Sequence, residues 1–323
     1  MKTPARTLAR LAPLLGLVFV ALTFAILTGA PERYLSLQNL RVILAQTLIV
    51  ALGAISMTFI IVSGGIDLSV GSVIALTGVV AAALLRDGWS PWVALLAAVT
   101  AGGAAGLANG VIITRLRVVP FIATLGMLGV ARGVAKWLAS ERTVDVPTTW
   151  LNGLAVTVPA QPWLLVTPGV WLAIALAVLA SQVLRRTVFG RRVFAIGSSE
   201  AAARAAGVAV NRLKLWIYST AGLLFGLAGA MQMSRLRQGD PTVALGTELD
   251  IIAAVVIGGG SLNGGEGSIA GSMVGALTMA FLRNGSQQMG WPAYTQEIII
   301  GIIIVAAVAL DRWRSDRGSE ARG

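Results

Sequence analysis

The 323-residue sequence contains no cysteine and no histidine. Disulfides and Cys- or His-based zinc sites are therefore excluded. A Ser-His-Asp or Cys-His hydrolase is excluded as well, because both need a histidine base. No cofactor or metal is expected from the remaining residue types.

Lysine is scarce, and this bears on ATP hydrolysis. The three lysines are Lys2, Lys136 and Lys214, and none follows a glycine. The pattern G-x-x-x-x-G-K-[ST], which cradles nucleotide phosphates, is consequently absent. The chain is therefore not expected to be an enzyme that hydrolyses ATP by this route.

Charge is also scarce, at 12% of residues, whereas apolar residues make up 56%. Soluble domains carry about 25% charged residues. This composition predicts an all-α polytopic protein embedded in a lipid bilayer. The net charge of +11 does not indicate a nucleic-acid partner, because the basic residues fall in short loops and tails between apolar stretches.

About ten apolar stretches are candidate transmembrane helices. The first follows a basic start that resembles a signal peptide, but it approaches the ~20 residues needed to cross a bilayer, so it is interpreted as a span. The predicted spans are residues 11–29, 41–62, 70–85, 92–109, 120–138, 164–184, 215–233, 249–259, 269–283 and 293–310.

The basic residues predict the orientation of the chain. Most of the 25 Lys and Arg fall at the two termini, at Arg115 and Arg117, and in the polar loop 185–214. The side richer in Lys and Arg is normally cytoplasmic. We therefore expect a multi-pass protein with both termini in the cytoplasm.

Loop 185–214 is the longest polar, basic run. Within it, residues 199–206 are typical of a short helix, with Ser198 or Ser199 as the N-cap and Glu200 in the first turn. Gly207 is the candidate stop. This pattern indicates a docking segment for a cytoplasmic partner.

Two glycine-rich breaks, residues 63–69 and 258–268, interrupt the apolar pattern, and they suggest an internal repeat near the translocation path. Asp67 has two interpretations: it orders the helix break or pairs with a basic residue during gating, or it caps the following helix. Glu266 precedes a later helix in the equivalent place, and the same cap interpretation applies to it. The predicted helix-break and gating residues are Gly64, Gly65, Asp67, Gly71, Gly258, Gly259, Gly260, Gly264, Gly265 and Glu266.

Small residues four apart predict close helix packing in the spans that contain Gly102 and Gly222. A few amides and hydroxyls are available to a neutral, hydroxyl-rich solute. The possible pathway-lining residues are Gln46, Asn109, Thr124, Asn284, Gln288 and Glu297.

Four motifs carry a resemblance to a known family. They are the stretch 57–72 with Gly64-Gly65-Ile66-Asp67-Leu68-Ser69, the stretch 121–126, the stretch 190–207, and the stretch 248–268 with Gly258-Gly259-Gly260-Ser261-Leu262. Over residues 35–310 the chain resembles the permease subunit of bacterial monosaccharide ABC importers of the ribose, xylose, arabinose and rhamnose type. It departs at Ser198-Ser199-Glu200, where relatives often carry a Gly-Asn pair.

The resemblance implies a fold similar to the ten-helix permease of the vitamin B12 importer, in the bacterial inner membrane. It also implies cytoplasmic ABC ATPase subunits, a second permease subunit, identical or homologous, and an extracytoplasmic sugar-binding protein. The segment 197–207 would then be a coupling helix for the ATPase. Its implied coupling residues are Gly197, Ser198, Ser199, Glu200, Ala201, Ala202, Arg204 and Gly207.

Two alternatives stay open at the level of sequence. One is a related ABC permease for branched-chain amino acids or nucleosides. The other is a self-sufficient secondary transporter or channel for a small polar solute, although a dedicated ion relay would usually show several carboxylates deep in its spans.

Overall fold

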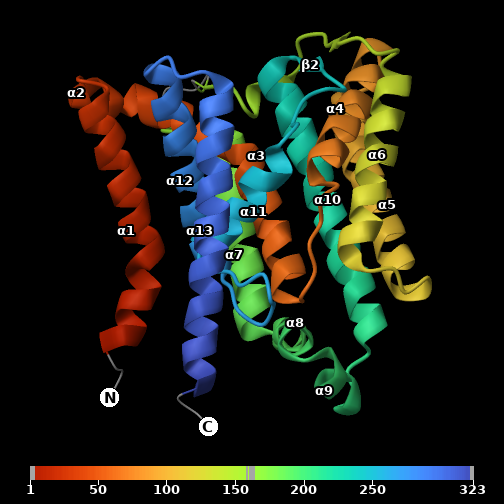
Figure 1. Cartoon of the computed structure of the whole chain (residues 1–323). Helices are drawn as coiled ribbons and strands as arrows, with labels where there is room; N and C mark the ends of the chain where they lie inside the picture. Colours follow the sequence, from red (N-terminus) through yellow and green to blue (C-terminus); the bar gives the residue numbers. More distant parts are fainter. Residues whose placement is uncertain (1–3, 158, 160–163, 321–323) are drawn as a thin grey trace.

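The computed structural model describes residues 4–157, 159 and 164–320, which form an α-helical bundle with a small two-stranded sheet (Figure 1). Lys2 and Arg322, two of the terminal basic residues from which cytoplasmic termini are predicted, lie outside the described residues. The first half contains α1 (Pro4–Leu27), α2 (Pro31–Tyr34), α3 (Leu37–Val62), α4 (Val70–Arg86), α5 (Pro91–Arg115), α6 (Pro120–Leu138), β1 (Val144–Asp145) and the 3₁₀ helix η1 (Trp150–Gly153). The second half contains α7 (Pro168–Arg186), α8 (Val188–Ser198), α9 (Glu200–Ala205), α10 (Val210–Leu236), β2 (Gln238–Gly239), α11 (Thr247–Ile257), α12 (Ile269–Gln288) and α13 (Ala293–Glu320).

Several helices begin at a capping serine. The hydroxyls of Ser36, Ser90 and Ser268 accept hydrogen bonds from the backbone N–H three residues later, at the starts of α3, α5 and α12. Pro91 occupies the first position of α5, where a missing N–H costs nothing. Local sequence therefore fixes where these helices start.

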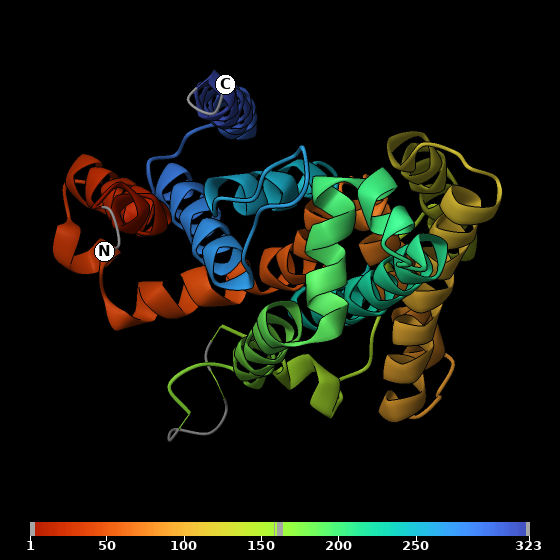
Figure 2. The ribbon, with the colours of Figure 1, turned by 90° about the horizontal axis from the view of Figure 1, so that it is seen from below.

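Helix α3 lies at the centre of the bundle. In its most apolar stretch 83% of residues are buried, against 22% in α6 and in α7. Figure 2, viewed along the bundle, places α3 between α12, α7 and α10. Since α6 and α7 are apolar but little buried, their outer faces suit contact with lipid.

Among the described residues, five helices are long and apolar enough to cross a membrane: α3, α5, α6, α7 and α10. Leu11–Leu27, α4 and Ala293–Ala306 are apolar but shorter, and neither α11 nor α12 meets the same criterion. The chain is thus an all-α, multi-pass membrane protein, and these criteria do not establish the ten-span count.

Glycines bring α5 and α10 into close contact. A Cβ added at Gly102 would overlap the carbonyl oxygen of Gly222, and one at Gly106 would overlap that of Tyr218. The predicted small-residue faces therefore pack against each other, as expected where lipid provides no hydrophobic drive.

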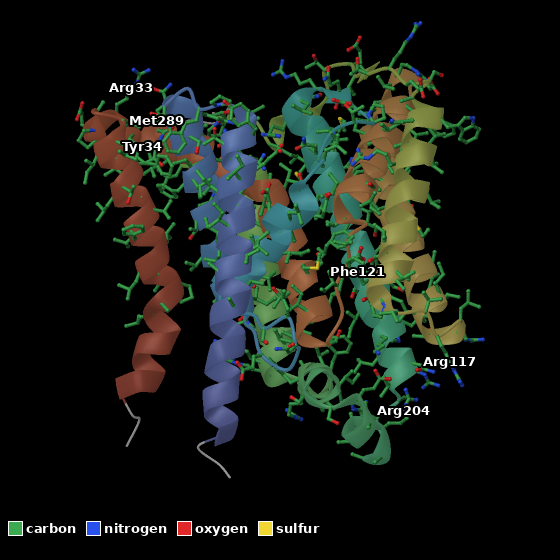
Figure 3. All side chains as sticks on the ribbon, viewed as in Figure 1. Arg33, Tyr34, Arg117, Phe121, Arg204 and Met289 are labelled. Carbon is green, nitrogen blue, oxygen red and sulfur yellow. The ribbon has the colours of Figure 1, made fainter. Side chains whose placement is uncertain are left out.

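The two ends of the bundle differ. Helices α8 and α9, the start of α1 and the end of α13 lie at one end (Figure 1). Figure 3 places Arg117 and Arg204 at this end, and Arg33, Tyr34 and Met289 at the other. β1 and β2 pair antiparallel, with Val144 opposite Gly239, and β2 lies at the end away from α8 (Figure 1).

Candidate coupling site and helix breaks

The segment predicted as loop 185–214 contains two helices rather than one. α8 (Val188–Ser198) follows α7 directly, and α10 begins at Val210, before the predicted start at residue 215. Helix α8 is amphipathic: Gly190, Val193 and Ile196 are buried, while Arg191 and Arg192 are exposed. Because of its arginines, this stretch is interpreted from sequence as a polar loop.

The expected short helix is present as α9. Ser199 accepts a hydrogen bond from the backbone N–H of Ala202, and the N–H of Gly207 bonds to the carbonyl of Arg204. Gly207 has a φ of +80°, so it ends the helix as predicted. Gly197 and Ser198, however, belong to the end of α8, so the stretch 197–207 is not one continuous helix.

Helix α9 is held to α10 by Glu200. Its carboxylate accepts hydrogen bonds from Lys214 Nζ at 2.6 Å and from Arg204 at 2.8 Å. The hydrogen bond from Lys214 is the largest cause that lowers the pKa of Glu200 below its ordinary value of 4.5, followed among the lowering causes by the bond from Arg204. Ala201 and Ala202 are exposed on the same short helix.

A lowered pKa predicts how this attachment responds to pH. The stabilisation from Glu200 is fully present above its unfolded pKa and is lost as pH falls through the lowered folded pKa. We expect the amides of residues 200–206 to be protected at pH 7, and their protection, measured as the ratio of the intrinsic to the observed exchange rate, to fall as pH drops below 4.5. Glu200→Gln should show fast exchange already at pH 7. Arg204→Gln is the matched control, because the lysine contact stays, and equal exchange in both variants would contradict the assignment.

The end of α8 meets both glycine-rich breaks at a contact we call the glycine junction (Gly64, Gly197, Gly264 and Gly265). A Cβ added at Gly197 would overlap the carbonyl oxygen of Val62 and lie 2.5 Å from the nitrogen of Gly265. A Cβ at Gly264 would lie 2.9 Å from the Cα of Gly64. At Gly197, Gly264 and Gly265 the junction therefore leaves no room for a side chain.

A hydrogen bond joins the two breaks directly. The N–H of Gly265 donates to the carbonyl of Val62, the last residue of α3, at 2.9 Å. Gly64, Gly264 and Gly265 have φ between +78° and +84°, a region that favours glycine. Movement of α8 would thus act at once on the end of α3 and on the loop before α12.

The second break also brings helices close together. A Cβ at Gly258 would lie 2.5 Å from the carbonyl oxygen of Gly271, and Gly259 has a φ of +88°. A Cβ at Gly260 would lie 2.7 Å from the side chain of Val255. Glu266 is exposed, and Ser268 rather than Glu266 caps α12. The capping interpretation of Glu266 is therefore wrong.

Asp67 lies in the first break and is 1% exposed. Its Oδ1 accepts hydrogen bonds from the backbone N–H of Ser69 at 2.8 Å and from the hydroxyl of Ser69 at 2.6 Å. The amide of Asn109 on α5 donates to Ser69 Oγ at 3.1 Å. Asp67 is thus buried and orders the break, which is one of its two predicted roles, and it does not lie at a water boundary as the predicted cap would.

Thr124 supports the same segment from α6, because its hydroxyl accepts from the N–H of Leu68 at 3.1 Å. Buried backbone groups without helix partners must find other partners. Asn109 and Thr124, predicted as possible pathway-lining residues, therefore lie around the first break.

Two substitutions of Asp67 test whether its hydrogen-bond acceptor stabilises the first break. Asp67→Ala leaves the buried Ser69 N–H and hydroxyl without their acceptor, which costs roughly 1–3 kcal/mol. Asp67→Asn keeps an oxygen of similar position and should cost less. Denaturant unfolding of the purified chain measures both, and unchanged stability in Asp67→Ala would contradict this role.

The other predicted pathway residues lie toward the opposite end and largely bond to one another. Asn39 and Asn284 exchange amide hydrogen bonds at 3.0 and 3.1 Å, and Gln288 donates to both. Gln46 donates to Gln287 at 3.2 Å. These amides tie α3 to α12.

An ion pair missed in the sequence links α11 to α12. Asp250, 2% exposed, pairs with Arg283, and the exposed Glu297 on α13 acts electrostatically on Asp250. Opposite charges in two neighbouring apolar segments were the available signal. At the start of α4, a Cβ on Gly71 would lie 2.5 Å from the carboxylate of Glu248, so α4 and α11 begin close together.

The family and the relatives that match this chain are all described as transport permeases. The family described as "Branched-chain amino acid transport system / permease component" matches residues 39–308. The chain is 40% identical to the ribose import permease protein of Escherichia coli K12 over 304 residues, 92% of each chain. It is 35% identical to the L-arabinose ABC transporter permease protein of Azospirillum brasilense, over 94% of this chain and 88% of the relative. It is 33% identical to the fructose import permease protein of Rhizobium meliloti, over 93% and 84%. No solved structure matches.

Proposed function

Because the chain belongs to the family of branched-chain amino acid transport system permease components, we propose that it is the membrane-spanning permease subunit of an ATP-driven importer that carries a monosaccharide. The substrate class follows the relatives' names, which specify ribose, L-arabinose and fructose. ATP hydrolysis then belongs to a separate cytoplasmic subunit, since the sequence has no phosphate-binding P-loop.

The single observation that carries the mechanism is the glycine junction. ATPase subunits docked on α8 and α9 move Gly197 against Val62 and Gly265. Because the contact has no free space, this rigid-body motion passes to α3 and to the loop before α12. The pathway then switches between inward-open and outward-open states.

The orientation and partners complete the proposal. The start of α1 and the end of α13 lie at the same end as α8 and α9, which supports cytoplasmic termini (Figure 1). Ten spans arranged as in the vitamin B12 importer are compatible with the ten helices other than α2, α8 and α9 in the described chain. A second permease subunit and an extracytoplasmic sugar-binding protein complete the importer.

A pull-down from native membranes tests the partner. We expect an ABC ATPase to bind the wild type and to be lost in the double variant Glu200→Lys, Gly207→Trp, because these changes disrupt α9. Glu141→Lys, the same charge reversal at an exposed position between α6 and β1, serves as the control. Absence of an ATPase from both samples, with intact protein, would overturn the proposal.

Uptake assays test the substrate and the energy source. In cells with the matching ATPase and binding protein, labelled ribose, arabinose or fructose should enter only while ATP is available. Uptake by the purified chain alone along an ion gradient would favour a secondary transporter. If leucine but no sugar competes with the transported solute, the chain is a permease for branched-chain amino acids, the substrate named in the family description.

A further inference from the structure

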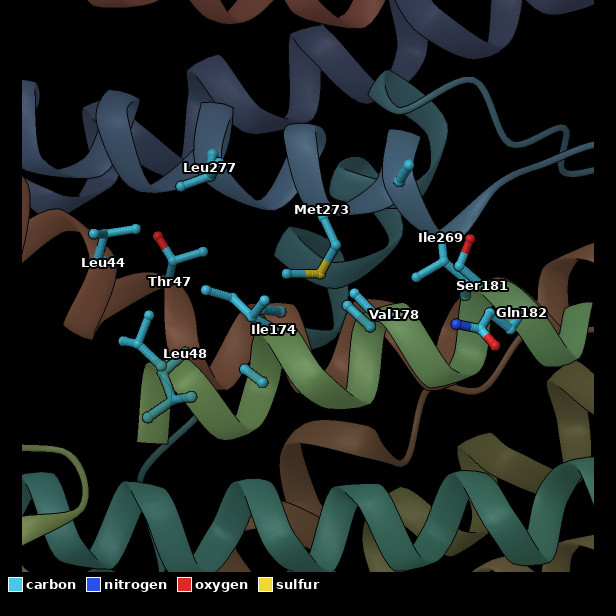
Figure 4. A pocket seen from close by; sticks show the side chains of 15 residues that line it. Leu44, Thr47, Leu48, Ile174, Val178, Ser181, Gln182, Ile269, Met273 and Leu277 are labelled. Carbon is cyan, nitrogen blue, oxygen red and sulfur yellow. The ribbon is translucent and has the colours of Figure 1, made fainter. Parts of the chain in front are cut away.

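An apolar cavity of about 440 Å³ lies between α3, α7 and α12 (Figure 4). Leu48, Ile174, Val178 and Met273 are among its lining residues. The cavity volume falls in the range of small-molecule sites. Its walls suit a hydrocarbon and not a hydroxyl-rich sugar.

The cavity opens toward the surroundings of the bundle. Ile174 and Val178 are 42% and 53% exposed, although both belong to the membrane-spanning helix α7. The hydroxyl of the wall residue Thr47 donates a hydrogen bond to the carbonyl of Ile43 at 2.7 Å, so it offers no free donor to a ligand in the cavity. Acyl chains of the bilayer therefore have direct access to the cavity.

The polarity of α7 changes along the cavity. Residues four apart share one helix face, and Ile174, Val178 and Gln182 line the cavity in that spacing. Figure 4 shows Ser181 and Gln182 together at one end, with Leu44 and Leu277 at the other. The wall is thus apolar over most of its length and hydrogen-bonding at the end nearest α8.

Two arginines continue these rows beyond the cavity. Arg186 follows Gln182 by four residues, and Arg185 follows Ser181 by four. Both are exposed, and neither forms an ion pair within the described part of the chain. The site therefore has three regions in order: an apolar wall, a polar end and two guanidinium groups. A phospholipid has the matching order of acyl chain, glycerol region and phosphate.

We propose that this cavity binds one acyl chain of an anionic phospholipid whose phosphate is held by Arg185 and Arg186. The lipid belongs to the leaflet that borders α8. Basic pockets between transmembrane helices recognise anionic headgroups in this way. The bound headgroup lies beside Thr187, which caps α8, so it supports the corner from which α8 departs.

Lipid titration of the purified full chain tests the headgroup site. Native mass spectrometry counts dioleoyl phosphatidylglycerol or phosphatidylcholine bound in detergent. We expect phosphatidylglycerol to bind more tightly, and the double variant Arg185→Gln, Arg186→Gln to weaken its binding roughly twenty-fivefold, about fivefold for each arginine. Arg191→Gln with Arg192→Gln is the matched control, because it removes the same charge from exposed positions on α8.

A second pair of variants tests the cavity. Ile174→Trp fills it and should abolish the tight phosphatidylglycerol site, whereas Leu179→Trp, on the same helix but outside the lining, should not. Thermal unfolding without lipid confirms that each variant is folded. Equal losses in the two arginine pairs, or equal binding of both lipids, would overturn the proposal.

The absence of cysteine allows a direct test of the occupant. The variant Val178→Cys, labelled with a photoactivatable benzophenone, should form lipid adducts in native membranes. Adducts to a second copy of the chain or to another protein would show that a protein helix fills the cavity, and the proposal would then be wrong.

Discussion

Replacing Gly197 by valine should abolish transport while leaving the protein in the membrane. A Cβ at this position overlaps the carbonyl oxygen of Val62 and approaches the nitrogen of Gly265, and both are backbone atoms that cannot rotate away. The end of α8 must then separate from the two breaks. We expect uptake to fall at least tenfold, which corresponds to about 1.4 kcal/mol of lost coupling, with ATP hydrolysis by the associated subunit continuing.

The control for Gly197→Val is Gly133→Ala. Gly133 lies on α6 with nothing within 4 Å of an added Cβ, so this change should preserve uptake. Membrane abundance and ATPase co-purification are measured for both variants. Normal sugar uptake by Gly197→Val would show that force does not pass through the glycine junction.

Two neighbouring glycines on α5 should differ sharply in their tolerance of alanine. Gly102→Ala places a Cβ onto the carbonyl oxygen of Gly222 and 2.6 Å from the nitrogen of Gly226, so α5 and α10 must move apart. Overpacking of this kind costs roughly 1–3 kcal/mol or more. We expect a lower unfolding midpoint and a reduced yield of folded protein from membranes.

Gly103→Ala provides the matched comparison, because it is the same substitution one residue along the same helix. Its Cβ would meet only the end of the Leu223 side chain, which can change rotamer. We therefore expect nearly wild-type stability in denaturant titrations. Equal destabilisation by the two substitutions would mean that helix propensity, and not the α5–α10 contact, determines the effect.

In the coupling segment, adjacent residues predict the bounds of α9 but neither α8 nor its long-range contacts. Ser199 and Gly207 predicted the bounds of α9 because capping and left-handed stops depend on a few adjacent residues. Helix α8 escaped prediction because its apolar face appears only at helical spacing, among exposed arginines. The contact of Gly197 with Val62 and Gly265 joins residues far apart in the chain, and no local pattern encodes it.

The predicted pathway residues show that residue type alone does not identify a side chain's partner. Asn109, Thr124 and Asn284 were grouped by chemistry as possible contacts for a solute. In the fold, the first two hold the break around Asp67 and the third bonds to Asn39. Residue type states which hydrogen bonds a side chain can make, whereas helix rotation decides which partner it meets.

The sequence by itself determined the membrane class, the absence of thiols and of the P-loop pattern, the positions of the glycine breaks and the family. These properties depend on composition and on short stretches of adjacent residues. Only the tertiary structure decided that both breaks meet the end of α8, that Asp67 is buried, and that an apolar cavity leads to Arg185 and Arg186. The reason is that packing sets the rotation and depth of each helix, and with them the long-range contacts that periodicity leaves open.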